Sequence, residues 1–506
     1  MNTQTNSQFN VAVKPNTAAR VVAGVLLSLL SGVMLTLSFA PYNAWPLIFV
    51  AFLPLILAQY RIMPPKQTSL APAIMIGTFL YLYFGPNMFG GGIMLALPVI
   101  GFLINLLAEK KRRSFHETTH YRWFILHGAI TWVGFEILRT FIPGIATWGF
   151  VNYTLYSQTW LIQPVSIFSI YGLSLLIMFI NYGIGQILLV KFDSRWHLDD
   201  NAPISKSATH RWAWGIGIIA ALWMGLSLFQ YTSAPDNVET VRVAAIQLGE
   251  EEVAFSHPDM DATARLNKLA TLTRTAAEQG AQLISWSELA LPFDPQQEFT
   301  AELAALAAET NAYLVLPYGV FEENGLRNEV VILSPEGDFS EPYAKAHPVL
   351  FAGEPYGLNV GTFPVYETPL GTIATVICYD LNYTDVTRKM AQQGAQIIAA
   401  PSSDWAGIAE KQNVHIVFRA IETRTSIVNA EKGFDSVIVD PYGRILEETI
   451  SLEATQAVLV QDVPLGTADS LYLRLGDVLG WVALAGVVLF TVFEKKLVTM
   501  EGRFAG

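Results

Sequence analysis

Long uncharged runs, made mostly of apolar residues, distinguish the first 230 residues from the rest of the chain. No Asp, Glu, Lys or Arg occurs from Val21 to Tyr60 or from Gln67 to Ala108. A membrane span needs about 20 apolar residues, and prolines and glycines divide each run near its middle. The two runs therefore predict four spans, at 21–40, 44–60, 69–85 and 91–108. A cleaved signal peptide is the alternative for the first run, but its long polar lead and the second span behind it argue against that.

Four further apolar segments extend the series to eight predicted transmembrane helices, with the added spans at 123–142, 161–190, 212–231 and 475–493. Lys and Arg follow every second span, whereas the alternate short loops contain neither residue. Because basic loops stay in the cytoplasm, the pattern predicts cytoplasmic termini and an extracytoplasmic segment before the last span. We expect a seven-helix transmembrane domain, an extracytoplasmic domain, and an eighth helix with a cytoplasmic C-terminus, at 1–234, 235–470 and 471–506.

Two charged residues, Glu136 and Arg139, lie inside the fifth predicted span, three positions apart on one helix face. Charged residues inside a membrane are costly, and they usually face a cavity or a partner. An internal ion pair that fixes helix packing is the alternative. Arg139 lies toward the outer end of the span, where the phosphate of a lipid headgroup would sit.

The pattern changes to alternating short strands and amphipathic helices after residue 234. Apolar, β-branched runs predict strands, and segments with helical periodicity predict helices between them. A turn at Asp440-Pro441-Tyr442-Gly443 predicts a final hairpin of 434–439 and 444–447. This order indicates a layered α/β domain. The expected strands are 241–248, 281–286, 313–318, 328–333, 396–400 and one ending at Cys378, and the expected helices are 259–279, 296–310, 383–393 and 407–424.

Composition supports a membrane part joined to a globular part. The chain is 52% hydrophobic and only 15% charged, against about 25% charged residues in a usual soluble domain. The net charge is −12, and the absence of a basic patch argues against a nucleic-acid partner. A single cysteine excludes an internal disulfide bond, and neither a zinc motif nor a nucleotide motif is present. We therefore predict no metal and no cofactor.

Three polar residues lie at strand ends or in the loop between strands, namely Glu288, Lys345 and Cys378. A carboxylate can take a thiol proton, and a lysine can stabilise both the thiolate and the oxyanion of a tetrahedral intermediate. Each residue also has a plainer interpretation. A lone cysteine in an apolar strand is more often a small buried hydrophobic residue, and the other two are commonly solvated at the surface.

Several motifs around these residues resemble the nitrilase superfamily: Val-Ala-Ala-Ile-Gln (243–247), Ser-Trp-Ser-Glu-Leu-Ala (285–290), Tyr-Ala-Lys-Ala-His (343–347), Ile-Cys-Tyr-Asp (377–380) and Asp-Pro-Tyr-Gly-Arg (440–444). The resemblance implies an α-β-β-α sandwich with a Glu-Lys-Cys triad. Glu288 would be the base, Lys345 the stabiliser of oxyanion and thiolate, and Cys378 the nucleophile. With eight spans around this domain, nearly the whole chain resembles the apolipoprotein N-acyltransferase family.

The same resemblance implies substrate-binding or lid residues outside the triad, which are Arg139, Asn328, Glu354, Tyr379, Asp380 and Trp405. The apolar side chains beside Glu354 (Phe351, Pro355, Tyr356 and Leu358) look like a lid over a cavity that is open to the bilayer. The chain departs from the family pattern in an extra residue within 350–354, in Asp380 for glutamate, in Ser402-Ser403, and in the charged segment 431–435. Phe255 stands where the family has a tryptophan. These departures lie around substrate contacts.

The implied activity is ping-pong acyl transfer at a bacterial cytoplasmic (inner) membrane, with the catalytic domain on the periplasmic side. Cys378 would take a fatty acyl chain from phosphatidylethanolamine or phosphatidylglycerol as a thioester. The chain would then pass to the α-amine of a diacylglyceryl-cysteine apolipoprotein. Two alternatives stay open: a membrane-anchored amidase of the nitrilase type, and a catalytically degenerate relative that binds lipid or lipoprotein. The eight spans argue against the amidase because anchoring needs only one.

Overall fold

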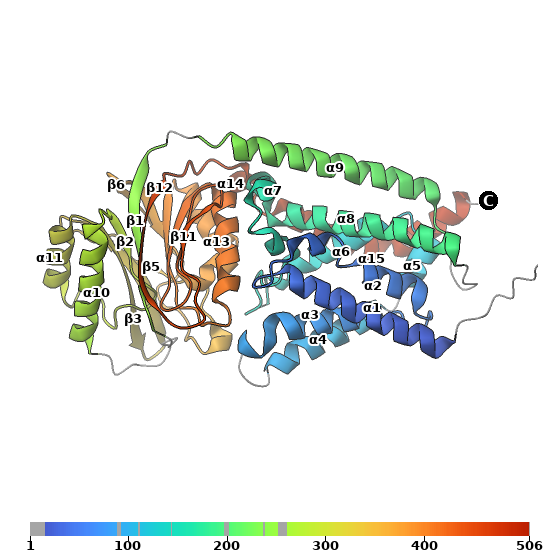
Figure 1. Ribbon diagram of the computed structural model, residues 1–506, viewed down its shortest axis with the longest axis horizontal. Coiled ribbons are helices and arrows are strands. Elements are labelled where there is room, and N and C mark those ends of the chain that lie inside the picture. Colours follow the sequence, from blue (N-terminus) through green and yellow to red (C-terminus); the bar gives the residue numbers. More distant parts are fainter. Residues whose placement is uncertain are drawn as a thin grey trace, which may run out of the picture.

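A helix bundle and a β-sandwich lie end to end along the longest axis of the protein (Figure 1). The computed structural model describes residues 16–88, 93–109, 112–142, 144–196, 202–235, 238–250 and 261–504. Three sets of residues used in the sequence analysis lie outside the described residues. They are the glycines 90–92, which divide the second uncharged run, Lys110 and Lys111, which belong to the basic loop after the fourth predicted span, and Phe255.

Each predicted membrane segment contains helix. The helices are α1 (Thr17–Ser38), η1 (Trp45–Phe49) with α2 (Leu53–Leu57) and η2 (Ala58–Ile62), α3 (Leu70–Met88), α4 (Ile93–Ala108), α6 (Phe124–Arg139), α8 (Val165–Arg195), α9 (Lys206–Thr232) and α15 (Val478–Phe504). Pro46 and Pro54 lack a backbone N–H and stand at the beginnings of η1 and α2, where they divide the second segment. Short helices connect the others: α5 (Arg112–Thr118), η3 (Val151–Leu155), α7 (Thr159–Ile162) and α14 (Leu471–Leu475).

Four helical segments in the described part of the chain are long and apolar enough to cross a membrane: Thr17–Ser38, Trp45–Ile62, Val165–Arg195 and Lys206–Thr232. Leu70–Gly85 and Val478–Glu494 are shorter apolar helices. The total of eight spans stays a prediction, because segments such as α6, with 16 residues, are short for a full crossing. The beginning of α1 and the C-terminus lie at the end of the bundle away from the sheets (Figure 1).

The sandwich consists of two six-stranded sheets. The first has the order β12-β1-β2-β3-β4-β5, built from Gln456–Pro464, Thr240–Leu248, Leu283–Ser285, Tyr313–Glu322, Gly325–Leu333 and Tyr343–Ala344. The second has the order β11-β10-β9-β8-β7-β6, built from Ile445–Glu448, Val437–Val439, Ser426–Ala430, Ile397–Pro401, Gly371–Thr375 and Val365–Thr368. In each sheet the central strands run parallel and the edges are antiparallel.

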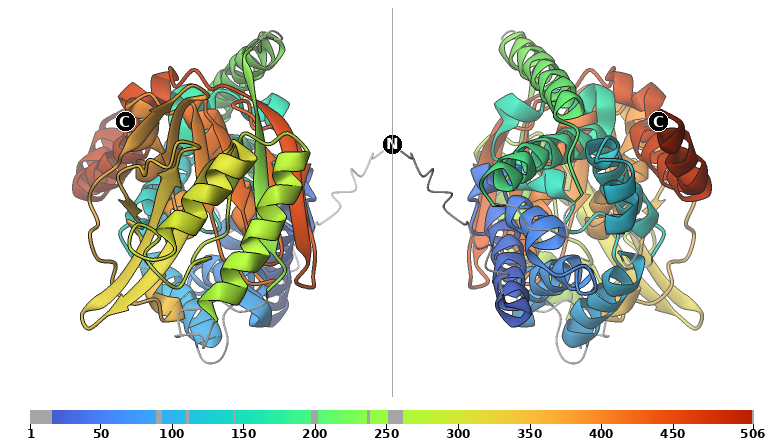
Figure 2. Two further views of the ribbon diagram at one scale, coloured as in Figure 1. Left: turned by 90° about the vertical axis from the view of Figure 1, so that its left-hand side faces the viewer. Right: turned by 90° about the vertical axis from the view of Figure 1, so that its right-hand side faces the viewer.

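Helices cover both outer faces of the sandwich, which gives an α-β-β-α arrangement. Helices α10 (Ala262–Glu278) and α11 (Thr300–Thr310) lie over the first sheet and face the viewer in the left view of Figure 2. Helix α13 (Ala409–Thr423) lies between the second sheet and the bundle, and it packs on α8 and on α12 (Asp385–Gln392) (Figure 1). The predicted α/β layered domain is therefore confirmed. The nine-residue strand β12, which pairs antiparallel with the whole of β1, was not predicted.

A buried polar cluster joins the sandwich to the bundle. On α13, Arg419 and Glu422 form an ion pair of 2.7 Å, and both side chains are fully buried. Glu422 Oε1 also accepts a 3.0 Å hydrogen bond from the backbone N–H of Ile170 in α8. There α8 is interrupted by Ser169, whose φ is +60°, and Ser169 Oγ donates to Asp477 Oδ1 at 2.6 Å. The break in α8 thus leaves the backbone N–H of Ile170 available to donate to Glu422 of the sandwich, which joins the two parts.

The first prediction concerns this junction. Glu422→Ala should lower the free energy of unfolding by about 3 kcal/mol, because the buried Arg419 guanidinium loses its counter-charge. Denaturant titration of the detergent-solubilised protein, followed by tryptophan fluorescence, would measure the change. Glu309→Ala is the matched control, since Glu309 pairs with Arg274 at the surface and should matter little. Equal losses in the two variants would contradict a docking role for the cluster.

Candidate active site

Cys378 lies in a tight turn directly after the second sheet's β7. The strand ends at Thr375, so the prediction of a strand that reaches the thiol was wrong by three residues. Cys378 begins the turn η5 (Cys378–Asn382) with φ +46°, a left-handed conformation that costs energy for any residue except glycine. Its side chain is 5% exposed. A strained turn at the end of a sheet strand holds the thiol at a fixed point.

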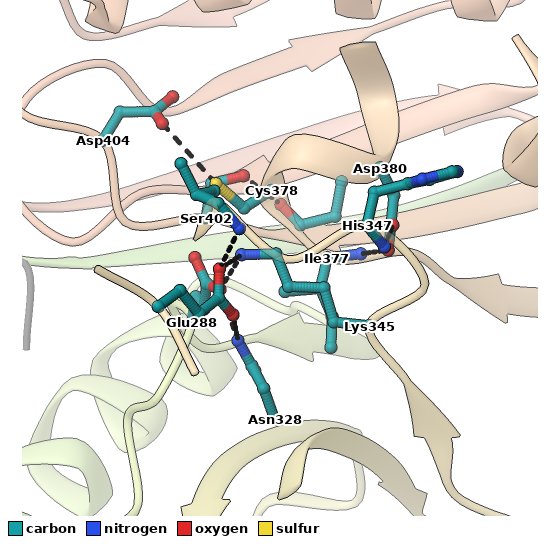
Figure 3. A network of polar contacts seen from close by, with 12 residues as sticks. Glu288, Asn328, Lys345, His347, Ile377, Cys378, Asp380, Ser402 and Asp404 are labelled. Atoms are coloured by element: carbon teal, nitrogen blue, oxygen red, sulfur yellow. Dashed lines mark hydrogen bonds and ion pairs between the residues drawn. The ribbon is translucent and has the colours of Figure 1, made fainter. Parts of the chain in front are cut away.

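Lys345 follows β5 of the first sheet and is almost fully buried between two carboxylates. Its Nζ donates to Glu288 Oε1 at 2.8 Å (Figure 3). It also donates to Glu354 Oε2 at 2.8 Å. Burial lowers the pKa of the ammonium, but the charges of Glu288 and Glu354 outweigh burial and raise that pKa well above its usual value. Lys345 therefore stays positively charged next to Cys378, whose thiolate it also stabilises.

Asn328 on β4 fixes the relative position of the two carboxylates. Its Nδ2 donates to Glu288 Oε1 at 2.7 Å and to Glu354 Oε1 at 2.9 Å. Glu354 Oε2 accepts a further hydrogen bond of 2.6 Å from the backbone N–H of Val349. These contacts place the predicted lid residue Glu354 inside the lysine site, as a group that positions Lys345. Glu288 Oε2 accepts no hydrogen bond from the described residues.

The thiol itself donates to Asp404, which lies beyond the end of β8. The distance from Cys378 Sγ to Asp404 Oδ1 is 3.6 Å. The neighbouring Trp405, which the family resemblance implies as a substrate-binding residue, is half-buried and packs against the core. The only available signal for Asp404 was its place beside Trp405 in a loosely matched motif. Burial raises the pKa of the Cys378 thiol well above its usual value, and the charges of Glu288 and Asp404 add to the rise, whereas Lys345 lowers it.

Asp380 holds the turn that carries Cys378 by hydrogen bonds to three other residues. Asp380 Oδ2 accepts from the Tyr343 hydroxyl at 2.6 Å and from the N–H of Ile377 at 3.1 Å. Its Oδ1 accepts from the N–H of His347 at 2.9 Å, so it joins the cysteine turn to the lysine loop (Figure 3). The Tyr379 ring is buried. Both residues thus lie beside the predicted triad.

The loop that carries Glu354 also presents apolar side chains near the site. The Phe351 ring lies 5.9 Å from that of Tyr379, and Tyr356 is 72% exposed. An exposed aromatic side chain beside a buried catalytic constellation fits a lid, which stays a proposal. Its anchor is the buried Glu354.

Arg139 and Glu136 do not form the ion pair that their spacing suggested. In the described structure Glu136 Oε1 accepts from Trp132 Nε1 and from the backbone N–H of Val151, each at 3.1 Å. The Arg139 guanidinium lies over the Phe150 ring, 4.9 Å from its centroid. The internal-pair interpretation was therefore wrong. A role for Arg139 in binding a headgroup phosphate stays a prediction.

Two family models cover most of the chain. Residues 242–472 match the carbon-nitrogen hydrolase model, and residues 31–183 match the apolipoprotein N-acyltransferase N-terminal domain model. The chain is 27% identical to an apolipoprotein N-acyltransferase of Geobacter metallireducens, over 93% of this chain and 95% of that protein. The chain belongs to the apolipoprotein N-acyltransferase family. An apolipoprotein N-acyltransferase of Rhodopseudomonas palustris is 23% identical to the chain, over 94% of this chain and 98% of that protein.

A solved amidase from Nesterenkonia sp. matches about half of the chain. The amidase is 20% identical in sequence, and the match covers 48% of this chain and 95% of the amidase chain, with a TM-score of 0.38. The apolipoprotein N-acyltransferase relatives, in contrast, match the helix bundle and the sandwich together.

The second prediction tests the position of Lys345. Glu354→Ala should slow acylation of Cys378 at least about 10-fold, because the lysine loses one of its two carboxylate partners and its fixed place. Stopped-flow or quenched mass spectrometry of the acyl-enzyme would measure the rate. Glu367→Ala, which removes an exposed acid from β6, is the matched control. Acylation at the wild-type rate in Glu354→Ala would contradict the positioning role.

The third prediction concerns the charge of the resting thiol. Because its pKa is raised, Cys378 should be neutral at pH 7, and its alkylation by iodoacetamide should keep accelerating above the ordinary thiol pKa of about 8.5. Intact-mass analysis reads the reaction unambiguously, since this is the chain's single cysteine. The unfolded protein in guanidinium is the control and should show an ordinary thiol profile. A folded-state rate that levels off below pH 8 would contradict the raised pKa.

Proposed function

We propose that the protein transfers a fatty acyl chain from a membrane phospholipid to the α-amine of a diacylglyceryl-cysteine apolipoprotein, through a thioester on Cys378. The observation that supports this most directly is the buried Cys378 thiol beside the ion-paired Lys345, in a sandwich set on the end of an apolar helix bundle. Cys378 lies close to this junction, because Gln412 of α13 donates to its backbone carbonyl and α13 packs on α8. The family assignment supports the same activity.

In the first half-reaction, Glu288 removes the thiol proton as general base, and its unpaired Oε2 is the oxygen available for this. The thiolate attacks the carbonyl carbon of the phospholipid ester. Lys345 and the backbone N–H of Tyr379 stabilise the resulting oxyanion. The C–O bond then breaks, the lysophospholipid alkoxide takes the proton from Glu288, and a thioester remains on Cys378.

In the second half-reaction, the α-amine of the apolipoprotein attacks the thioester carbonyl. A thioester suits this step because an amine attacks it more readily than it attacks an ester. The C–S bond breaks, an amide forms, and the free thiol returns. We further propose phosphatidylethanolamine or phosphatidylglycerol as the donor, and the periplasmic side of the inner membrane as the place of residues 235–470. The charge pattern of the loops supports that side.

The fourth prediction tests the thioester. After incubation with phosphatidylethanolamine in detergent, the intact mass of the protein should increase by one fatty acyl group. Hydroxylamine should remove the added mass, because it cleaves thioesters. Cys378→Ala should show no increase, while it should retain its folding as judged by thermal unfolding.

The acceptor is tested in the same preparation. With a diacylglyceryl-cysteine peptide present, the acyl chain should appear on the peptide amine, and free fatty acid should stay a minor product. Free fatty acid as the main product, with or without the peptide, would indicate an amidase-like hydrolase. No adduct with any phospholipid tested, in a folded protein, would contradict acyl transfer.

A further inference from the structure

A second pair of carboxyl groups, Asp404 and Glu431, adjoins the nucleophile. Asp404 follows β8 and Glu431 follows β9, and these neighbouring strands run parallel, so their carboxyl ends meet at one edge of the sheet. The Asp404 N–H donates to Glu431 Oε2 at 3.0 Å. The two side chains are 4% and 1% exposed. This pair is additional to the carboxylates that hold Lys345.

The two carboxyl pairs differ in whether a lysine pairs with them. Lys345 forms its ion pairs with Glu288 and Glu354, whereas Asp404 contacts the sulfur from another side (Figure 3). Burial raises the pKa of Asp404 to about 7, and it raises that of Glu431 well above its usual value. Asp404 can therefore exchange a proton with a substrate near neutral pH. Asp404 Oδ2 has no hydrogen-bond partner among the described residues.

The second half-reaction needs a group that removes a proton from the acceptor amine. An α-amine has a pKa of about 7.7–8.0, so at neutral pH it is mostly ammonium and has no free electron pair for attack. In the resting protein the thiol donates its hydrogen to Asp404 Oδ1. The sulfur of a thioester carries no hydrogen, so acylation leaves this buried oxygen without its donor. An arriving ammonium supplies both a hydrogen-bond donor and a proton at that point.

We propose that Asp404, supported by Glu431, binds the α-ammonium of the acceptor beside the thioester and takes its proton. This assignment rests on the proposed function. The N–H bond breaks toward Asp404, and the freed electron pair forms the C–N bond. The oxyanion collapses, the C–S bond breaks, and the second nitrogen proton passes through Glu288 to the Cys378 thiolate. Asp404 returns its proton to solvent, so the balance is one amide, one thiol and one released proton.

Charged groups near Asp404 and Glu431 influence the pH at which the two carboxyl groups lose their protons. The titratable and charged groups whose charges act on Asp404 or Glu431 are Glu288, Lys345, Cys378 and Asp435. Asp404 must be deprotonated to act as a base, so transfer should rise as pH increases through its pKa. In a variant without this base, transfer should instead follow deprotonation of the acceptor amine, at higher pH.

The fifth prediction uses Asp404→Asn with two nucleophiles. Acyl-enzyme is first loaded from phosphatidylethanolamine and then mixed with either a diacylglyceryl-cysteine peptide or hydroxylamine, which is already neutral at pH 7. Transfer to the peptide at pH 7 should fall about 100-fold, a usual loss for a general base. Release by hydroxylamine should stay near the wild-type rate. The defect with the peptide should shrink as the pH rises above the pKa of its amine.

Asp440→Asn is the matched control, because Asp440 is as buried as Asp404 and accepts its hydrogen bonds from the backbone N–H groups of Tyr442 and Arg444 in its own turn. Glu431→Gln gives a second test should Asp404→Asn not fold, and it should slow the peptide reaction more than the hydroxylamine reaction. Equal slowing with both nucleophiles at every pH, or no slowing, would overturn the role of Asp404. A wild-type protein that never forms acyl-enzyme would instead overturn the proposed function on which this role rests.

Discussion

The buried ammonium of Lys345 is the constraint on which the rest of the catalytic domain depends. An unpaired charge in this position would be very costly, so the fold must deliver its partners with accurate geometry. Glu288 comes from the end of β2 and Glu354 from the loop after the lysine, and Asn328 on β4 holds both. Because these groups come from separate segments of one sheet, the ion pairs can form only after the sheet has formed.

The nucleophile comes from the other sheet, so the site exists only at the contact between the two. Cys378 and Asp404 follow strands of the second sheet, whereas Glu288 and Lys345 follow strands of the first. The backbone N–H of Glu288 donates to the carbonyl of Ser402, and Gln247 Oε1 accepts from Ser436 in the same way across the interface. A shift between the sheets would therefore separate Glu288 from Cys378 while each sheet stayed intact.

The sequence predicted most of the elements, because strand and helix periodicity are local, and the family motifs selected Glu288, Lys345 and Cys378, which the fold brings together. It did not predict the turn at Cys378, since Val376 and Ile377 continue the apolar run and nothing in their pattern marks the left-handed residue that follows. The hydrogen-bond partners of Asp380 could not be predicted from local sequence either, because Tyr343 is 37 positions away in the chain. Spacing alone also suggested a pair between Glu136 and Arg139, where a backbone N–H from a distant turn satisfies the glutamate.

The helix bundle does more than anchor this domain, since it supports the nucleophile turn directly. The hydroxyl of Thr147, in the segment after α6, donates to the carbonyl of Asn382 at 2.7 Å, at the end of η5. From α13, Gln412 donates to the carbonyl of Cys378 at 3.2 Å, and the same helix carries the Glu422 junction to α8. These contacts tie the strained cysteine turn to the helix bundle, so a movement of the bundle would act directly on the position of the thiol.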